Sequence, residues 1–366
     1  MLFFTIKKSR ILILINKDVI GGAEVQALNF FNWCKCNNIN TYLFFLEKGF
    51  KKNFFLNNSF INYILQIYRV FYIVNKYKPS VIDAHLSRSC YIASILKLFY
   101  PHIILVLNNH TNVYEYYSKK GITGKINIFL TRILFPLADL IICVSEYCKR
   151  DFSSINKCTQ KIFVVPNSFY FNYDLIYENP FSNNESNVFN VIFVGRLVIE
   201  KNVDIIISSF RFLPNNFKLY VIGDGPQYTN LSNIIVNLNL SDRVKLIGSS
   251  NCVGKWYQHS NLCVLASESE SFGNVVIESF SYGTPVLCFQ GSGGPSEILS
   301  SFDSYFCYPL NNPHVIAKYI KFIEEFSKKN IVDSQNFINY SKNYCVSKIC
   351  PKKLTLILNL YSLNFS

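Results

Sequence analysis

The sequence predicts an α/β protein with two successive doubly wound domains, each a parallel sheet with helices on both faces. Three observations lead to this prediction. Short, continuously apolar runs alternate with longer segments of helical periodicity, a pattern typical of parallel strands buried on both faces. The alternation pauses once, in a polar, Asn-rich stretch over residues 177–190, and then restarts. The chain has 366 residues, half of them hydrophobic, which is enough for two buried cores.

The first half contains six apolar runs that we expect to be strands. They are residues 10–16, 41–47, 80–85, 102–108, 139–145 and 161–167. Apolar residues recur at helical spacing over 23–35, directly after the first run, so a helix is expected there. We place a first domain over residues 1–172 and a linker over 173–189, because the polar stretch around Pro180 has the composition of a linker.

The second half repeats the pattern over residues 190–335, which we expect to form the second domain. Its strands are predicted at 190–195, 218–223, 243–248, 261–266 and 285–290. Helices are expected at 203–213 and 274–283. A C-terminal segment over 336–366 has a weak helical pattern, and we expect Pro351 to break any helix in it.

The net charge of +13 lies entirely in the first half. Residues 1–172 contain 21 Lys and Arg against 8 Asp and Glu, whereas residues 173–366 contain 15 of each kind. A charge this uneven indicates that the first half faces an acidic partner, namely nucleic acid, an anionic membrane or a phosphorylated substrate.

The twelve cysteines are scattered, and several lie in apolar runs, which favours buried free thiols and a cytoplasmic protein. The N-terminal residues do not have the order of a secretory signal. The best candidate for a membrane span, residues 126–144, is interrupted by Arg132, Pro136 and Asp139. No Asp-x-Asp occurs in the sequence, and we predict neither a catalytic metal nor a cofactor.

Two features that follow predicted strands are typical of phosphate sites. Gly21 and Gly22 stand just before the first helix, where backbone amides can approach an anion. A tight turn without a ligand explains these glycines equally well. Arg196 and Lys201 follow the strand at 190–195, and this pair of cations would suit a diphosphate. Their alternative is an ordinary solvated loop.

The strongest signal lies in residues 267–297. Glu270 is expected in a loop, Gly273 at the start of a helix, and Glu278 one turn inside that helix. A helix N-terminus can hold a diphosphate through its free amides, and an acidic residue set back from it can accept hydrogen bonds from ribose hydroxyls. The alternative is a surface helix with two solvated carboxylates.

This segment resembles the signature of retaining family-four glycosyltransferases. In that family two glutamates eight positions apart frame a Phe-Gly turn, as Glu270 and Glu278 frame Ser271-Phe272-Gly273 here. Further ordered matches are Ser281–Val286, Gly293–Ile298, Val194–Leu197, Glu200–Asp204 and Gly223–Pro226, and, more weakly, Gly22–Glu24, Asp83–His85, Asn109–His110, Val144–Glu146 and Val165–Asn167. The resemblance covers roughly residues 8–330 and implies the GT-B architecture, in which two Rossmann-like domains face each other across a cleft. It also implies that the C-terminal segment over 336–366 crosses back to the first domain.

The resemblance also implies roles for individual residues. Arg196 and Lys201 would neutralise the donor diphosphate as it leaves, which is stabilisation of transition-state charge. Glu278 would bind the nucleotide ribose, and Glu270 would contact the transferred sugar. The backbone amides of Phe272, Gly273 and Asn274 would contact sugar and phosphate.

In the first domain the resemblance implies that Gly21 and Gly22 approach the same diphosphate. His110 corresponds to a family histidine close to the reacting sugar, and it could donate, accept or only orient. His85 matches less specifically, and we expect a structural role for it. The family's mechanism retains the anomeric configuration without a protein nucleophile, so Glu270 is not assigned as one.

Three positions depart from the family pattern. Ser168, Phe169 and Tyr170 follow Pro166-Asn167 where the family has Gly and an acidic residue. Ser271 follows Glu270, and Asn202 follows Lys201, where family members often have Gly. None of these changes removes a charged group, although they could alter the choice of donor.

The basic first domain is expected to meet the acceptor. Lys48, Lys51 and Lys52 lie among phenylalanines over 44–55, of which Phe44 and Phe45 are expected in the core. A second basic and aromatic segment covers residues 114–132. This interleaving is typical of an anionic membrane interface and would also attract a lipid-linked diphosphate. Nucleic acid fits the charge but not the glutamate signature.

These observations predict a retaining hexosyltransferase that moves a sugar from a UDP- or GDP-sugar to a lipid-linked or surface-glycan acceptor, as in lipopolysaccharide or capsule synthesis. We expect it at the cytoplasmic face of the cell membrane as a peripheral protein. One alternative is another GT-B enzyme, a sugar-nucleotide hydrolase or epimerase. The other is a non-catalytic membrane-binding scaffold with the same fold, and fold alone does not decide between them. The intact Arg196, Lys201, Glu270 and Glu278 argue against a scaffold, because a decayed site loses its costly buried charges first.

Overall fold

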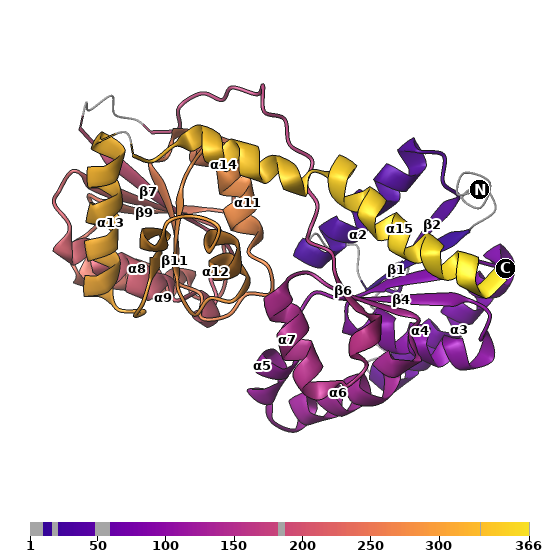
Figure 1. The fold of residues 1–366 in the computed structure, drawn as a ribbon. Coiled ribbons are helices and arrows are strands. Elements are labelled where there is room, and N and C mark those ends of the chain that lie inside the picture. The colour runs from indigo at the N-terminus through magenta and orange to yellow at the C-terminus, as the bar shows by residue number, and fades with distance from the viewer. Residues whose placement is uncertain (1–9, 17–20, 48–58, 182–186, 330, 366) are drawn as a thin grey trace. The chain divides into compact units, whose positions relative to one another are not determined.

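The chain forms two compact units in a computed structural model that describes residues 10–16, 21–47, 59–181, 187–329 and 331–365. Unit 1 contains residues up to Tyr170 together with Cys345–Ser366, and unit 2 contains Phe171–Tyr344 (Figure 1).

Unit 1 is built on a six-stranded parallel sheet with the strand order β2-β1-β3-β4-β5-β6. The strands are β1 (Ile11–Ile15), β2 (Thr41–Phe45), β3 (Val81–His85), β4 (Ile104–Asn109), β5 (Leu140–Cys143) and β6 (Ile162–Val164). The helices are α2 (Gly22–Cys36), α3 (Ser59–Tyr77), α4 (Ser87–Phe99), α5 (Val113–Ser118), α6 (Gly121–Leu134), α7 (Glu146–Ile155) and α15 (Val346–Phe365).

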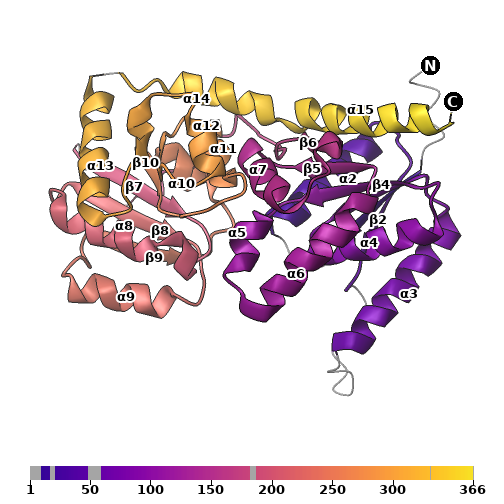
Figure 2. The ribbon, with the colours of Figure 1, turned by 60° about the horizontal axis from the view of Figure 1, so that its bottom comes forward.

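Helices cover both faces of this sheet. Alternate residues of β1, namely Ile11, Ile13 and Ile15, pack in one apolar cluster with α2 and α15. Helices α3, α4 and α6 lie on the opposite face (Figure 2). Because both faces are covered, all five residues of β1 are fully buried, and this explains why the strands read as continuous apolar runs.

Unit 2 repeats the architecture with the strand order β12-β11-β10-β7-β8-β9, again in parallel. Its strands are β7 (Phe189–Val194), β8 (Phe217–Ile222), β9 (Val244–Gly248), β10 (Leu262–Leu265), β11 (Val286–Phe289) and β12 (Cys307–Tyr308). Its helices are α8 (Val203–Ser209), α9 (Tyr228–Asn237), α10 (Gly254–His259), α11 (Asn274–Ser281), α12 (Gly294–Leu299), α13 (Pro313–Lys328) and α14 (Ser334–Ser341).

Two parallel six-stranded sheets confirm the predicted fold class, and each of the eleven predicted strands overlaps an observed one. The sequence analysis missed β12 because a strand of two residues carries no periodicity. Residues 171–181 pack on unit 2, where the rings of Phe181 and Tyr220 lie 4.6 Å apart. None of the described helices is both long and apolar enough to span a membrane.

The expected break at Pro351 is wrong. α15 is a single helix over Val346–Phe365 with Pro351 inside it. Proline there removes one intrahelical hydrogen bond, but the buried side chains of Ile349, Leu354 and Ile357 hold the helix against the sheet and α2. Packing of an apolar face contributes more to a helix than the loss of one bond removes.

The backbone segments that follow β7 and β8 in unit 2 approach each other closely. The chain leaves β7 at Gly195 and β8 at Gly223, and a Cβ atom on Gly223 would lie 1.8 Å from the Gly195 carbonyl oxygen. Gly248 ends β9 with a φ of +79°, but a Cβ there would meet nothing within 4 Å. Gly223 has a φ of +144°, so a substitution there meets both backbone strain and a steric clash, whereas a substitution at Gly248 meets backbone strain alone.

We predict that Gly248→Ala costs about 1 kcal/mol, the usual cost of a left-handed alanine, and that Gly223→Ala costs several times more. Calorimetric melting of the full chain measures both variants. Equal losses in the two variants would mean that the contact between Gly223 and Gly195 does not restrict the chain.

Candidate functional site

A cation-bearing loop follows β7 in unit 2. Arg196 is exposed, and within the described part of the chain no ion pair is formed by its guanidinium. Lys201 ends a short 3-10 helix, and Asn202 then turns the chain in the left-handed region with φ 48° and ψ 41°. The Asn202 amide donates a 3.1 Å hydrogen bond to the Ala266 carbonyl at the end of β10. Asn tolerates this conformation almost as well as Gly, which explains the departure at this position.

Lys201 is thereby placed against Glu270. Lys201 Nζ lies 2.8 Å from Glu270 Oε1, and both side chains are largely buried. The backbone around Glu270 is fixed by two 2.8 Å hydrogen bonds, from its own amide to the Ser292 carbonyl and from the Gly294 amide to its carbonyl. The sequence indicated Lys201 for the diphosphate and Glu270 for the sugar, and did not predict that the two would form an ion pair. Two neighbouring loops hold this pair in one arrangement.

The turn after Glu270 exposes the N-terminus of α11. Gly273 is the N-cap residue with φ 93°, a conformation that favours glycine. A Cβ at Gly273 would lie 2.8 Å from Pro295 Cγ, and one at Gly294 would lie 2.4 Å from the Phe272 carbonyl oxygen. The first amides of α11 precede the regular i to i−4 pattern of the helix, and the Val276 amide donates a 3.0 Å hydrogen bond to the carbonyl of Gly273. This backbone can accept an anion at the place where the sequence predicted one.

Glu278 lies one turn inside α11. The Tyr257 hydroxyl donates a 3.2 Å hydrogen bond to Glu278 Oε2. Burial raises the pKa of Glu278, the bond from Tyr257 opposes that shift, and the charge of Glu270 adds to it. A carboxylate that is desolvated and has one donor can accept further hydrogen bonds, such as those of vicinal hydroxyls.

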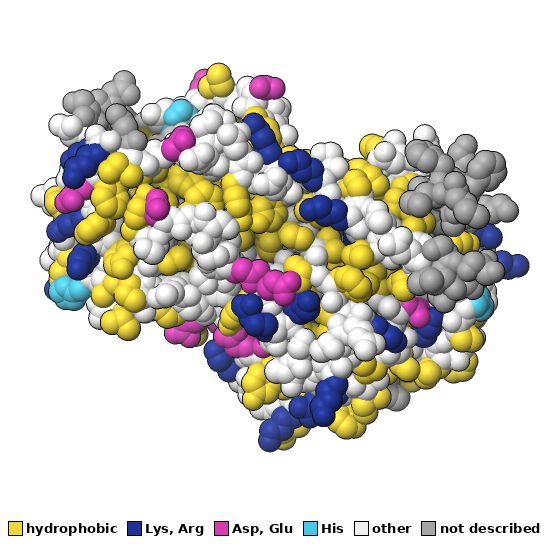
Figure 3. Space-filling model, in the orientation of Figure 1, with side chains coloured by type: hydrophobic (Ala, Val, Ile, Leu, Met, Phe, Trp, Pro, Cys, Tyr) yellow, Lys and Arg dark blue, Asp and Glu magenta, His cyan; other side chains and the backbone are white. Residues whose placement is uncertain are grey.

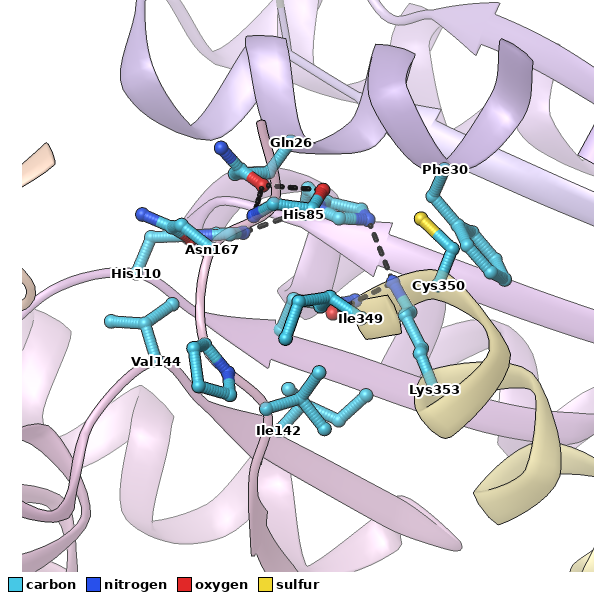
Figure 4. A pocket seen from close by; sticks show the side chains of 14 residues that line it. Gln26, Phe30, His85, His110, Ile142, Val144, Asn167, Ile349, Cys350 and Lys353 are labelled. Carbon is cyan, nitrogen blue, oxygen red and sulfur yellow. Dashed lines mark hydrogen bonds between the residues drawn. The ribbon is translucent and has the colours of Figure 1, made fainter. Parts of the chain in front are cut away.

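The remaining predicted residues belong to unit 1. Gly21 and Gly22 are exposed at the start of α2, and Gly21 is its N-cap residue. His110 follows β4 directly and lines a small pocket of about 30 Å3 with residues of α2, β4 and α15 (Figure 4). Residues 48–58, which include Lys48, Lys51, Lys52, Phe50, Phe54 and Phe55, lie outside the described residues. Phe44 and Phe45 are half-buried on β2.

His110 is connected to a buried polar network. His110 Nε2 lies 3.0 Å from His85 Nδ1, and His85 Nε2 lies 3.2 Å from Asp83 Oδ2. Lys353 on α15 donates to Asp83 Oδ2 at 2.7 Å and to Asn108 Oδ1 at 3.0 Å. A structural role was expected for His85. In addition, its ring connects His110 to the buried ion pair of Asp83 and Lys353.

No role for Lys353 or for Asp83, which belongs to the Asp83–His85 match, was predicted from the sequence. Both are buried, and each interrupts an otherwise apolar element, as Lys353 does between Cys350 and Leu354 on α15. A lone charge at a core position is the signal that could have pointed to them, since buried charges are paired. Burial and the positive charge of Lys353 lower the pKa of His85, and burial and His85 lower the pKa of His110 well below its ordinary value.

Ser168 takes part in the same pocket. Its amide and hydroxyl both donate to Gln26 Oε1, at 2.6 and 3.1 Å, and its carbonyl accepts from Asn29 Nδ2 at 2.6 Å. The departure from glycine at this position thus adds a hydroxyl that helps to hold the segment after Asn167 to α2. Among the described residues, no group of three or more His, Cys, Asp or Glu side chains is arranged to hold a metal ion.

Comparison with known families assigns both halves of the chain. Residues 177–344 match the model described as glycosyl transferases group 1, and residues 39–169 match the glycosyltransferase family 4 model. The chain belongs to the family-4 glycosyltransferases. It has their GT-B fold and is a nucleotide-sugar-dependent glycosyltransferase.

Individual relatives are distant. An uncharacterized glycosyltransferase of Methanocaldococcus jannaschii is 30% identical over 63% of this chain and 61% of its own length. An N-acetylgalactosaminyltransferase of Campylobacter jejuni, named for a diphospho-undecaprenol substrate, is 27% identical over 73% of this chain and 75% of its own length. The crystal structure of Anabaena HepE with UDP and glucose has a TM-score of 0.76 at 19% identity and covers 96% of this chain and 100% of its own.

The raised pKa of Glu278 predicts a pH-dependent cost in stability for this glycosyltransferase. As pH rises, the unfolded carboxyl loses its proton first, and the folded one keeps it up to a higher pH, so the wild type loses stability across that window. Glu278→Gln cannot ionise but can still accept from Tyr257. We therefore expect its melting temperature to exceed that of the wild type at neutral pH, with a difference that shrinks towards acidic pH.

The matched control is Glu268→Gln. Glu268 is exposed in the same loop, and its replacement should leave the melting temperature unchanged at every pH. A Glu278→Gln variant that is less stable than the wild type at neutral pH would contradict the argument from burial.

Proposed function

We propose that the protein transfers a hexose from a UDP-sugar to a lipid-linked or glycan acceptor with retention of configuration. The observation that carries this proposal is the 2.8 Å pair of Lys201 and Glu270, which lies in the loop that leads into the N-terminus of α11. A lysine and a row of backbone amides suit a diphosphate, and a carboxylate next to them suits sugar hydroxyls. UDP is favoured over GDP because the structurally similar HepE is described in complex with UDP and with UDP-glucose.

In the proposed reaction, the bond between the sugar C1 and the diphosphate oxygen breaks while the acceptor oxygen bonds to C1 on the same face. The electron pair of the broken bond goes to the diphosphate, and the acceptor proton passes to a phosphate oxygen. Lys201, Arg196 and the first amides of α11 stabilise the charge that develops on the leaving group. Glu270 orients the sugar and keeps Lys201 in place, and Glu278 accepts hydrogen bonds from the ribose.

The acceptor is proposed from the relatives. The Campylobacter enzyme is named for an acceptor on diphospho-undecaprenol. A Rhizobium meliloti relative, 31% identical over 28% of this chain, is named for lipopolysaccharide core biosynthesis. These names support a lipid-linked or surface glycan and a role in polysaccharide synthesis.

An exposed apolar stripe on α6 supports attachment to an anionic membrane. Ile122, Ile126, Phe129 and Ile133 recur at helical spacing and are each 51–77% exposed. The exposed cations that accompany the stripe are Lys119, Lys120, Lys125 and Arg132. Basic and hydrophobic side chains lie side by side over α6 in Figure 3. An amphipathic helix with cations beside its apolar face is typical of interfacial binding to anionic lipid.

The donor proposal predicts that UDP raises the melting temperature by mass action and that GDP does so less. Glu278→Gln should weaken UDP binding about ten- to a hundredfold, which corresponds to the loss of hydrogen bonds to a charged acceptor. Lys201→Met should lower kcat by about a hundredfold or more, whereas Lys245→Met on β9 should change neither quantity.

Three results would contradict parts of the proposal. Equal binding of UDP by wild type and Glu278→Gln would contradict the ribose role. Release of free sugar from the donor at the full rate without any acceptor would favour a sugar-nucleotide hydrolase, and a folded protein that binds no nucleotide would favour a scaffold.

The membrane proposal predicts that the protein sediments with vesicles that contain phosphatidylglycerol and less with phosphatidylcholine alone. Ile126→Ser combined with Phe129→Ser should weaken this binding by about tenfold or more, because each side chain buries apolar area in the interface. Val236→Ser, at a similarly exposed position on α9, is the control. If the double variant with Ile126→Ser and Phe129→Ser sediments with the vesicles as much as the Val236→Ser control does, a role for the α6 stripe is contradicted.

A further inference from the structure

The buried network of unit 1 contains one cation with three acceptors around it. Lys353 Nζ lies 2.7 Å from Asp83 Oδ2, 3.0 Å from Asn108 Oδ1 and 3.3 Å from His85 Nε2. The Phe30 ring lies 4.5 Å from the same nitrogen, so the apolar cluster surrounds the ammonium group. A lysine ammonium has three protons and no lone pair, and these three neighbours can take one proton each.

Counting donors and acceptors fixes the remaining protons. Asn108 uses its two amide protons on Asp83 Oδ1 at 2.6 Å and on the Ala84 carbonyl at 3.0 Å. If Lys353 donates to His85 Nε2, that nitrogen has no proton, and His85 carries its proton on Nδ1. His85 Nδ1 then donates to His110 Nε2 across 3.0 Å. His110 must therefore carry its own proton on Nδ1.

The opposite arrangement leaves a conflict. His85 could instead donate from Nε2 to Asp83 Oδ2 at 3.2 Å. The third Lys353 proton would then face an N–H group at 3.3 Å and would have no acceptor. An unsatisfied buried donor costs about 1–3 kcal/mol, and the ammonium charge would also repel the imidazole N–H.

We propose that Lys353 is a positioning residue that acts through His85 to hold His110 in the tautomer protonated on Nδ1. His110 then offers a hydrogen-bond donor to a hydroxyl oxygen of the sugar substrates and cannot act as a general base through that nitrogen. This role of His110 toward a ligand rests on the proposed function, whereas the tautomer does not. The C-terminal helix thereby supplies a buried group that sets the chemistry of a residue in the first sheet.

Burial is consistent with neutral imidazoles in this chain of contacts. The pKa of His85 is lowered by burial and by Lys353, and that of His110 is lowered further by burial, His85 and Lys353, while Asp83 opposes both shifts. With both rings neutral, the choice between their two nitrogens is the variable that the ion pair controls.

The test is nitrogen-15 NMR of the full chain with labelled histidine, without substrate. The signals of His85 and His110 are assigned with His85→Gln and His110→Gln. We expect both rings protonated on Nδ1 and unprotonated on Nε2. A proton on Nε2 of either ring in the wild type would overturn the proposal.

Two variants are predicted to have opposite protonation states at His85 Nε2. In Lys353→Met, Asp83 is the remaining partner, and His85 Nε2 should become protonated to donate to it. At a pH where His85 is neutral, the proton of His110 then moves to Nε2. In Asp83→Asn combined with Lys353→Met, the carboxamide introduced at position 83 can donate to His85 Nε2, and the wild-type tautomers should return.

Transfer activity should follow the tautomer. Above the pKa of His85, Lys353→Met should lower kcat by about ten- to a hundredfold, the range seen when the outer partner of a functional histidine is lost. The double variant should recover most of that loss. Lys352→Met, an exposed neighbour on α15, is the control. A purely structural role predicts instead that activity follows stability and that the double variant keeps the defect.

The outcomes are separable. Removing one partner of a buried ion pair can cost about 3–5 kcal/mol, and if Lys353→Met does not fold, the wild type and the double variant still decide the tautomer. A protein that transfers no sugar but shows the expected tautomers would contradict the proposed function and leave this inference standing. Full activity in Lys353→Met with a shifted tautomer would overturn the link between the two.

Discussion

Parallel strand direction is the constraint on which both units depend. Every strand of a parallel sheet ends at the same edge, so the loops that follow the strands gather there. In unit 2 this edge carries Arg196 after β7 and Glu270 after β10. In unit 1 it carries His85 and His110, which end β3 and follow β4. Residues far apart in the sequence become neighbours because the strands before them pair in register.

The charged groups at these edges are held by their surroundings before any ligand binds. Lys201 is neutralised by Glu270, and the turn that carries Glu270 is fixed by backbone hydrogen bonds to the loop around Gly294. Glu278 is kept in a place that disfavours its charge. Because these groups are already in position, little reorganisation is needed when a ligand binds. Their interactions can therefore go to stabilising the ligand.

The sequence predicted much of this fold because the strands are buried on both faces and therefore continuously apolar. The donor residues could be predicted for another reason: Glu270, Gly273 and Glu278 lie within nine residues of one another, so one segment contains the whole pattern. Asn202 shows the limit of motif reasoning, since it stands where the family often has glycine and adopts the left-handed conformation that favours glycine.

The network of unit 1 could not be predicted in that way. Lys353 and Asp83 are 270 positions apart. Asp83 belongs to a weak motif match and Lys353 to none, and no motif connects the two. Their contact depends on α15 packing against α2. Long-range contacts between buried charges follow from tertiary packing, and the sequence indicates them only through a charge at a core position.

A crystal structure of the protein with bound UDP tests the account most directly. We expect the diphosphate within hydrogen-bond distance of Lys201 and of the first amides of α11, and a ribose hydroxyl on Glu278. A nucleotide bound in unit 2 away from Lys201 and Glu278, or bound only in the pocket beside His110, would contradict it.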